Sequence, residues 1–357
     1  MTKRRLTGTV GAAVVLACLV GVASCTSPGA HGGPTPTVRP TPTSSPTLTP
    51  TQTPTVIPTP TPVAAPTAAA SQRTGALVDL TIQLFPASNP WNTAIAGTAV
   101  DPRSAAYLAT MPGNLHMDFG ASWDGGPFGI PYTVVAGNQR KVPVTFDYVE
   151  DSDPGPYPIP SDVAIEGGAK ADGDRHVLVL DKDNLRLYEL WNAFPQADGS
   201  WHAGSGAVFD LRTNTLRPAG STSADAAGLP ILPGLVRYDE VAAGVIDHAI
   251  RFTVQNTQHG YVYPATHYAS DKTDPNLPPM GMRVRLKASF DISGYPPQAR
   301  VVLQAMKTYG LILADNGSSW FVSGTPDPRW DDDQLNTLKK VPGSAFEVVQ
   351  TGPVTTR

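Results

Sequence analysis

Cysteine is nearly absent from this 357-residue sequence, and so are the common catalytic signatures. Its two cysteines are Cys18 and Cys25, so no disulfide can form beyond residue 25. A secreted domain without disulfides depends on its hydrophobic core for stability. The sequence also lacks a G-x-S-x-G elbow, a Walker loop, a Rossmann glycine fingerprint, an H-E-x-x-H motif and a C-x-x-C pair. No common signature therefore assigns an activity.

Charged residues are also scarce, at 16% of the chain. This low content excludes a coiled coil, and no apolar run of 18 or more residues follows residue 24, which argues against a second membrane span. Residues 72–357 carry 22 basic and 30 acidic side chains, a net charge of −8. Nonspecific nucleic-acid binding depends on cations that neutralise phosphates. We therefore expect no nucleic-acid partner.

The first 25 residues have the pattern of an export signal. Basic residues from Lys3 to Arg5 precede the short apolar run Val10 to Val20. The segment Val22-Ala23-Ser24-Cys25 then resembles the lipobox of bacterial lipoproteins, in which the cysteine thiol receives a lipid. We predict a signal peptide over 1–24 and an extracytoplasmic protein anchored to the membrane by a lipid on Cys25. The alternative is an ordinary secretory signal that ends near a cysteine.

A tether is predicted over residues 25–71, ahead of a single domain over 72–357. The tract Pro34 to Pro66 holds 11 Pro and 11 Thr. Such Thr-Pro repeats favour extended polyproline II structure, because proline fixes φ and biases the preceding residue away from helix. The tract would therefore act as a spacer between anchor and domain. The remaining residues are enough for one large core, and no second linker interrupts them.

The predicted fold class is mainly β, a β-sandwich or barrel-like core with two or three short helices; α+β is the alternative. Short apolar or alternating runs separated by Gly/Pro-rich joints support it. Lys182-Asp183-Asn184 predicts a tight hairpin. Helices are expected at Ser104–Thr110, Pro297–Tyr309 and Asp332–Lys340. The expected strands are Pro131–Val135, Val142–Tyr148, His176–Leu180, Leu185–Trp191, Ala207–Leu211, Ala249–Val254, Arg283–Ala288, Leu311–Ala314 and Trp320–Val322.

Ionisable residues near predicted strand ends and turns give a candidate site, because loops on a rigid sheet commonly carry function. Glu189 alternates with Leu187 and Trp191 on one strand face, where an unpaired carboxylate is costly to bury. Asp315 follows an apolar strand. The alternative for each residue is a structural ion pair, turn or cap. The predicted catalytic set is Glu189, Asp225, Asp239, His248, Arg251 and Asp315, and the predicted substrate contacts are Trp191, Trp201, Arg237 and Trp320.

Several specific runs resemble a family of bacterial secreted proteins of uncharacterised function. The resemblance covers about residues 84 to 350. It implies one extracytoplasmic domain with variable N-terminal anchoring. Because the family has no established reaction, the resemblance assigns no catalytic residue to this sequence. The runs are Phe85 to Asn92, Asp153 to Pro160, Gly173 to His176, Thr222 to Pro230, Val236 to Val241 and Ala314 to Gly317.

Two functions are compatible with these features. The first is a surface-tethered glycoside hydrolase or polysaccharide lyase, which needs paired carboxylates, or His/Tyr with Arg, in a groove lined by Trp. The second is a noncatalytic lipoprotein that binds glycan or cell wall, since sugar faces stack on aromatic rings. The expected partners are an extracellular or cell-wall glycan and, through the lipid, the membrane. We expect a monomer with no metal and no cofactor.

Overall fold

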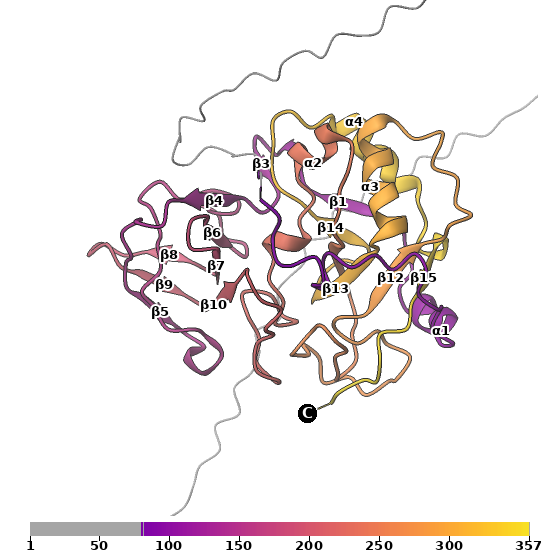
Figure 1. The fold of residues 1–357 in the computed structure, drawn as a ribbon, viewed down its shortest axis with the longest axis horizontal. Helices are drawn as coiled ribbons and strands as arrows, with labels where there is room; N and C mark the ends of the chain where they lie inside the picture. Colours follow the sequence, from indigo (N-terminus) through magenta and orange to yellow (C-terminus); the bar gives the residue numbers. More distant parts are fainter. Residues whose placement is uncertain (1–79, 81, 357) are drawn as a thin grey trace, which may run out of the picture. The chain divides into compact units, whose positions relative to one another are not determined.

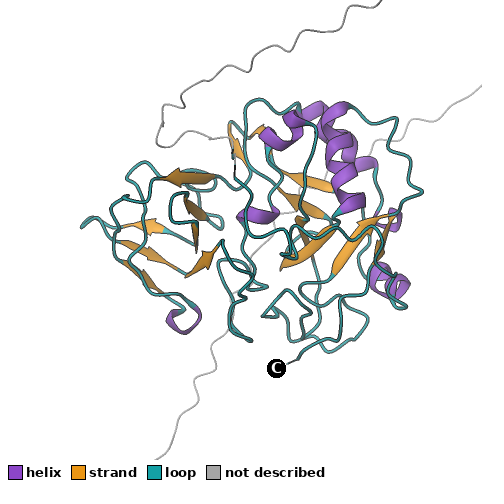
Figure 2. Cartoon of the chain, in the orientation of Figure 1, coloured by secondary structure: helices purple, strands orange, loops and turns teal. Residues whose placement is uncertain are grey.

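The folded part of the chain is mainly β, as predicted. The computed structural model describes residues 80 and 82–356, and within this range fifteen strands form four sheets, accompanied by a few short helices (Figures 1 and 2). The described residues belong to one compact unit. The sheets do not close into a barrel. The predicted signal peptide, Cys25 and the tether lie outside the described residues.

The largest sheet has six strands in the order β1-β14-β11-β13-β12-β15. It is mixed: β1 is parallel to β14 and β11 to β13, whereas the other neighbours are antiparallel. Helix α3 lies against β12 (Figure 1). The strands are β1 His116–Asp118, β11 Ile250–Val254, β12 Arg283–Leu286, β13 Leu311–Asn316, β14 Phe321–Ser323 and β15 Phe346–Val348.

The other three sheets come from the first half of the described chain. A four-stranded sheet runs β10-β7-β6-β4, a three-stranded sheet runs β5-β9-β8, and β2 pairs with β3. Strands β4 to β10 gather on the side away from α3 and α4 (Figure 1). The strands are β2 Gly120–Trp123, β3 Gly126–Phe128, β4 Tyr132–Val135, β5 Val144–Phe146, β6 Val177–Asp181, β7 Arg186–Trp191, β8 Phe194–Pro195, β9 Trp201–Ala203 and β10 Ser205–Asp210.

The four-stranded sheet is buried on both faces. Because successive side chains of a strand point to opposite faces, Leu178 and Leu180 of β6 join the large core, whereas Val177 and Val179 join a second, smaller core. Strand β9 also supplies side chains to this small core, so the four- and three-stranded sheets share it. The continuous apolar run of β6 is the sequence signature of such double burial.

Short helices form where they were predicted, and one more was missed. The observed helices are α1 Ser104–Ala109, α3 Pro297–Thr308 and α4 Asp332–Asn336, with 3₁₀ turns at Val149–Asp151, Leu232–Gly234, Thr337–Lys340 and Gly343–Ala345. The missed helix is α2, Tyr238–Ala243. Beyond the end of α3, Gly310 has φ +73°. A Cβ atom added at this position would clash with the Val284 carbonyl oxygen. Only glycine fits this helix end.

The hairpin prediction is confirmed. Strands β6 and β7 are antiparallel, with Asp181 opposite Arg186, so Lys182 to Leu185 make the connection. The Asp181 carboxylate accepts the backbone N–H of Asn184 at 3.0 Å and its side-chain amide at 2.8 Å. An aspartate that bonds its own turn in this way fixes the reversal of the chain.

Candidate functional site

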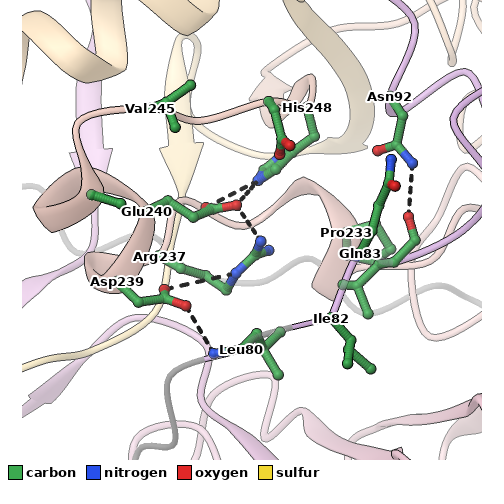
Figure 3. A pocket seen from close by; sticks show the side chains of 13 residues that line it. Leu80, Ile82, Gln83, Asn92, Pro233, Arg237, Asp239, Glu240, Val245 and His248 are labelled. Carbon is green, nitrogen blue, oxygen red and sulfur yellow. Dashed lines mark hydrogen bonds and ion pairs between the residues drawn. The ribbon is translucent and has the colours of Figure 1, made fainter. Parts of the chain in front are cut away.

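Six of the predicted site residues line two separate pockets, three in each. The first, which we call the acidic cleft, has a volume of about 420 Å³. The second, which we call the arginine pocket, has a volume of about 380 Å³ (Figure 3). No residue lines both. The cleft is lined by Tyr148, Asp151, Asp174, Trp191, Ser205, Thr222, Ser223, Ala224, Asp225, Ala226, His267, Asp315 and Asn316. The arginine pocket includes Arg237, Asp239, Glu240 and His248.

Strand ends position the acidic cleft. Trp191 is the last residue of β7 and lies opposite Ser205, the first residue of β10. Asp315 comes from the end of β13 in the six-stranded sheet, so the cleft takes residues from both large sheets. Asp225 belongs to the loop between β10 and the 3₁₀ turn Leu232–Gly234. Asp315 and Asp225 therefore lie at a strand end and in a loop, the kind of position at which site residues are expected from the sequence.

A bulge between β11 and β13 sets the place of Asp315. The two strands are parallel, with Phe252 opposite Leu313 and then Thr253 opposite Asp315, so Ala314 is an extra residue. The carbonyl of Ala314 accepts the N–H of Ala227 at 3.0 Å, which attaches the loop that carries Asp225. Bulges of this kind re-aim a neighbouring side chain and interrupt the regular ladder.

Arg251 connects the two carboxylates. Its Nε and Nη2 donate to the two oxygens of Asp225 at 2.9 and 3.0 Å, and Nη2 also donates to Asp315 Oδ2 at 3.3 Å. Nη1 donates to the hydroxyl of Ser323 at 2.7 Å. The Asp225 side chain is 0% exposed, whereas that of Asp315 is 30% exposed. Asp225 is therefore the buried counter-ion, and Asp315 is the carboxyl group that solvent or a ligand can reach.

Asp315 is held in an environment that favours its protonated form. Burial and the nearby Asp225 carboxylate raise the pKa of Asp315 to about 7, although Arg251 opposes this shift. Arg251 cannot favour both carboxylates equally, because its bidentate contact is with Asp225. Near neutral pH, Asp315 can therefore both donate and accept a proton.

A buried ion pair supports the loop from behind. His176 Nδ1 lies 2.6 Å from Glu166 Oε2, and its Nε2 lies 3.2 Å from the carbonyl oxygen of Ala224. Both ring nitrogens face acceptors, so the geometry fits the doubly protonated imidazolium. Burial lowers the pKa of His176, but the Glu166 carboxylate outweighs it and raises the pKa to about 9. The imidazolium thus holds Ala224, next to Asp225, in place.

An aromatic wall and a further carboxylate complete the cleft. The rings of Tyr148 and Trp191 lie 6.3 Å apart, and Trp191 Nε1 donates to Asp174 Oδ1 at 3.1 Å. His267 Nδ1 lies 3.0 Å from the Ala226 carbonyl oxygen, so Nδ1 carries a proton. The site prediction omitted Tyr148, Asp174 and His267. Asp174 lies in the run Asp172-Gly173-Asp174, which is typical of turns. This local pattern does not indicate that Asp174 lines a cleft.

The arginine pocket holds charges that are paired with one another. Arg237 bonds Glu240 through Nη2, and His248 Nε2 lies 3.1 Å from the same carboxylate (Figure 3). Asp239 Oδ2 accepts the N–H of Leu80 at 2.8 Å. Burial would raise the pKa of Glu240, but His248 and Arg237 lower it below its usual range. Nε and Nη1 of Arg237 have no hydrogen-bond acceptor among residues 80 and 82–356.

Three predicted site residues are not available to a ligand. Glu189 is 0% exposed, and its oxygens accept the N–H groups of Ile231 at 2.8 and 3.0 Å and of Leu232 at 2.9 Å. Burial raises the pKa of Glu189 to about 7, against the effect of these bonds. Trp320 is also 0% exposed and donates to the Met111 carbonyl. Trp201 is 7% exposed and lies in the small core. The structure corrects these three predictions, because burial hides the groups that would act.

Asp225 and Arg251 need a finer correction. Both are part of the cleft region, but each is nearly or fully buried and satisfied by its partner. They position Asp315 rather than meet a ligand. Arg237, Asp239 and His248 lie in the other pocket and cannot act together with Asp315. Of the predicted residues, the cleft thus presents Asp315 and Trp191 to solvent.

No family model, curated protein or solved structure matches the chain. Within the described part of the chain, no helix is both long and apolar enough to cross a bilayer. The same residues contain no group of three or more His, Cys, Asp or Glu side chains placed to hold a metal ion.

Proposed function

We propose that the protein cleaves extracellular polysaccharide in the acidic cleft, with Asp315 as the general acid. One observation carries this proposal: two adjacent carboxyl groups have opposite environments. Asp225 is fully paired with Arg251, whereas burial and Asp225 raise the pKa of the accessible Asp315 to about 7. An accessible carboxyl group with a raised pKa, beside a buried carboxylate that is fully paired, is suited to donate a proton.

Asp174 is the carboxylate best placed to act as the partner of Asp315. It lines the same cleft from a different segment, and its negative charge contributes to the raised pKa of Asp315. In the proposed step, Asp315 gives its proton to the glycosidic oxygen as the bond to the anomeric carbon breaks. Asp174 takes a proton from the water whose oxygen attacks that carbon. Asp174 then releases its proton to solvent and Asp315 takes one up, which restores both groups for the next cycle.

The aromatic wall supports a sugar as the substrate. Sugar rings have C–H faces that stack on aromatic rings, while their hydroxyl groups need polar partners. Trp191 and Tyr148 supply the rings, and Asp151, Thr222 and Asn316 supply polar groups in the same cleft. The hydrogen bond from Trp191 to Asp174 fixes the ring beside the proposed base. The cleft thus combines a stacking surface with acid and base groups.

The test is a comparison of Asp315→Asn and Asp174→Asn with wild type on a panel of polysaccharides. Both variants should lose at least about 100-fold in the release of reducing sugar while still binding the glycan. Asp172→Asn is the matched control, because Asp172 belongs to the same turn but does not line the cleft; it should keep wild-type activity.

Each other outcome has a definite meaning. Products with a new carbon–carbon double bond, seen by ultraviolet absorbance, would assign a lyase reaction instead of hydrolysis. Wild-type binding that depends on Trp191 but gives no product would make the protein a noncatalytic glycan-binding lipoprotein. A wild-type protein that neither binds nor cleaves any glycan of the panel would overturn the proposal.

We also propose that this domain is anchored outside the cytoplasm by a lipid on Cys25, as the lipobox pattern indicates. Cys25→Ala should abolish partition into detergent and release the protein, or leave uncut precursor. Cys18→Ala is the matched control, because Cys18 lies within the predicted signal and should not matter. Unchanged detergent partition of Cys25→Ala would contradict lipid attachment at this residue.

A further inference from the structure

We propose that a second site, on the four-stranded sheet, binds an anionic polymer through its phosphate or carboxylate groups. The site is an open groove of about 670 Å³, which we call the cationic groove. Lys141, Arg186 and Arg212 contribute three cations, and Tyr188 contributes an aromatic ring. The other lining residues are Asp153, Pro154, Gly155, Pro156, Asn184 and Val208.

Lys141 has a positive charge that no carboxylate neutralises. Its Nζ donates to the hydroxyl of Tyr188 at 3.2 Å and lies 5.4 Å from the centre of the Tyr188 ring. No carboxylate of the described residues forms an ion pair with it. An ammonium group held over an aromatic face keeps its charge available to an anion. Lys141 is thus a fixed cation at one side of the groove.

The two arginines share a single carboxylate. Arg212 bonds Asp210 through Nε at 2.8 Å and Nη2 at 2.7 Å, and Arg186 Nη2 lies 3.6 Å from the same group. One carboxylate cannot neutralise two guanidinium groups. Their side chains are 41% and 56% exposed, for Arg186 and Arg212. Free N–H groups of exposed guanidinium are well suited to the oxygens of phosphate or carboxylate.

The one carboxylate that lines the groove does not cancel this charge. Asp153 Oδ2 accepts from Arg217 Nη1 at 2.5 Å, and Arg217 is itself nearly buried. The groove and its immediate partners thus hold four cations, Lys141, Arg186, Arg212 and Arg217, against three carboxylates, Asp153, Asp181 and Asp210. In a chain whose residues 72–357 have a net charge of −8, this excess is a local exception. A local excess of cations attracts anions even on an acidic protein.

The groove and the acidic cleft have different lining residues, although Arg217 bonds Asp153 of the groove and the backbone carbonyls of Asp151 and Thr222 in the cleft. Tyr188 and Val208 are opposite each other on β7 and β10, and Tyr188 belongs to the small core, on the other face of the sheet from Leu187. The two sites share no lining residue. A polymer is the expected ligand, because exposed single ion pairs are weak and are screened by salt, whereas repeated charges on one chain add their contributions.

The test uses the full chain, with labelled polyphosphate, labelled polygalacturonate and neutral dextran as probes, by fluorescence anisotropy at about 50 and about 200 mM NaCl. Wild type should bind at least one polyanion, and more weakly at the higher salt. Any binding of dextran should be the same in wild type and in the groove variant described next. Lys141→Gln with Arg186→Gln should weaken polyanion binding by about tenfold. Both residues are exposed or half-buried, so the double variant should fold.

Lys182→Gln is the matched control, since Lys182 lies on the neighbouring turn and is paired with Asp183 at 3.0 Å; its polyanion affinity should equal that of wild type. Binding of polyphosphate alone would assign phosphate as the recognised group, and binding of polygalacturonate alone would assign carboxylate. Equal binding by wild type and the double variant, or binding of neither polyanion by wild type, overturns the proposal. Asp315→Asn should leave polyanion binding unchanged, which keeps this test separate from that of the cleft.

Discussion

The acidic cleft and the arginine pocket contain the same kinds of side chains but arrange them differently. In the arginine pocket, Glu240 bonds both Arg237 and His248, and all three side chains are at most 12% exposed. In the cleft, Arg251 meets two carboxylates and fully satisfies only Asp225, so Asp315 keeps a raised pKa and 30% exposure. Similar composition therefore gives buried charges that pair with one another in one place and an accessible acid in the other.

The difference shows which feature of an ionisable cluster points to chemistry. A network in which every charge has its partner stabilises the fold and leaves no group free to exchange a proton. A carboxyl group that shares its cation with a better-paired neighbour is left perturbed, and a perturbed group beside solvent can react. The number of charges is thus less informative than their imbalance and exposure.

The largest expected effect is on stability. Asp225→Ala removes the bidentate partner of Arg251, which is 4% exposed, and so leaves a buried charge poorly compensated. We expect a loss of about 3 to 5 kcal/mol in the free energy of unfolding, measured by urea denaturation. Asp315→Asn should lose less than about 1 kcal/mol, because its single contact with Arg251 is long, at 3.3 Å. Equal losses would erase the distinction between counter-ion and accessible acid.

The arginine pocket should respond in stability but not in glycan turnover. Glu240→Gln keeps the shape of the side chain but removes the negative charge between Arg237 and His248. We expect a loss of roughly 1 to 3 kcal/mol by the same urea method, with unchanged turnover. Asp247→Asn, at an exposed residue of the same pocket, is the control and should change neither. A loss of turnover at full stability would place the arginine pocket in the function.

The dependence of stability on pH should report the His176–Glu166 pair. The pKa of His176 is raised from 6.5 to about 9 in the folded protein. Its ion pair therefore contributes fully below about pH 6.5, and the contribution is lost as pH rises towards 9. We expect the melting temperature to fall across this interval in wild type and to fall less in His176→Gln. Parallel curves for the two proteins would show that the imidazolium does not hold the loop.

The smallest expected effect is on binding at the aromatic wall. Trp191→Ala should weaken glycan affinity by about 1 kcal/mol, or roughly fivefold, through loss of ring stacking. Its melting temperature should stay within a few degrees of wild type, since Trp191 is only partly buried. Trp123→Ala is the matched control: this ring is 70% exposed and lies outside the cleft. Equal weakening by both variants would indicate nonspecific contact with aromatic rings.

Local patterns predicted much of the fold. Three elements could be predicted because each depends on residues that are neighbours in sequence. They are the apolar run of β6, the turn at Lys182–Asn184 and the helix before Gly310. Helix α2 was missed because it is only six residues long, and Asp239 and Glu240 occupy its first turn. The bulge at Ala314 left no trace in the strand pattern, since it depends on pairing with a distant strand.

The candidate site was only partly predictable, for the same reason. Asp315 was singled out because it leaves an apolar strand, and this requires only local sequence. Trp320 also lies at the end of a predicted strand. Its ring is nevertheless enclosed by Phe252, Phe346 and Gly343, which are distant in the sequence. Glu189 was expected to be paired or reactive, and its actual partners are backbone N–H groups, which no sequence pattern displays. Burial and partnership are properties of the assembled sheets.

The extra residue in β13 has a consequence for how this chain can change in length. The carbonyl of Ala314 holds the loop of Asp225, and the same irregularity sets the register of Asp315. Substitution at position 314 by another small residue should leave both arrangements in place, because the carbonyl group and the strand pairing belong to the backbone. Deletion of this one residue would restore a regular ladder and remove the carbonyl that holds the loop, while Asp315 would still lie opposite Thr253. Position 314 can therefore vary in identity, but the chain cannot become shorter there.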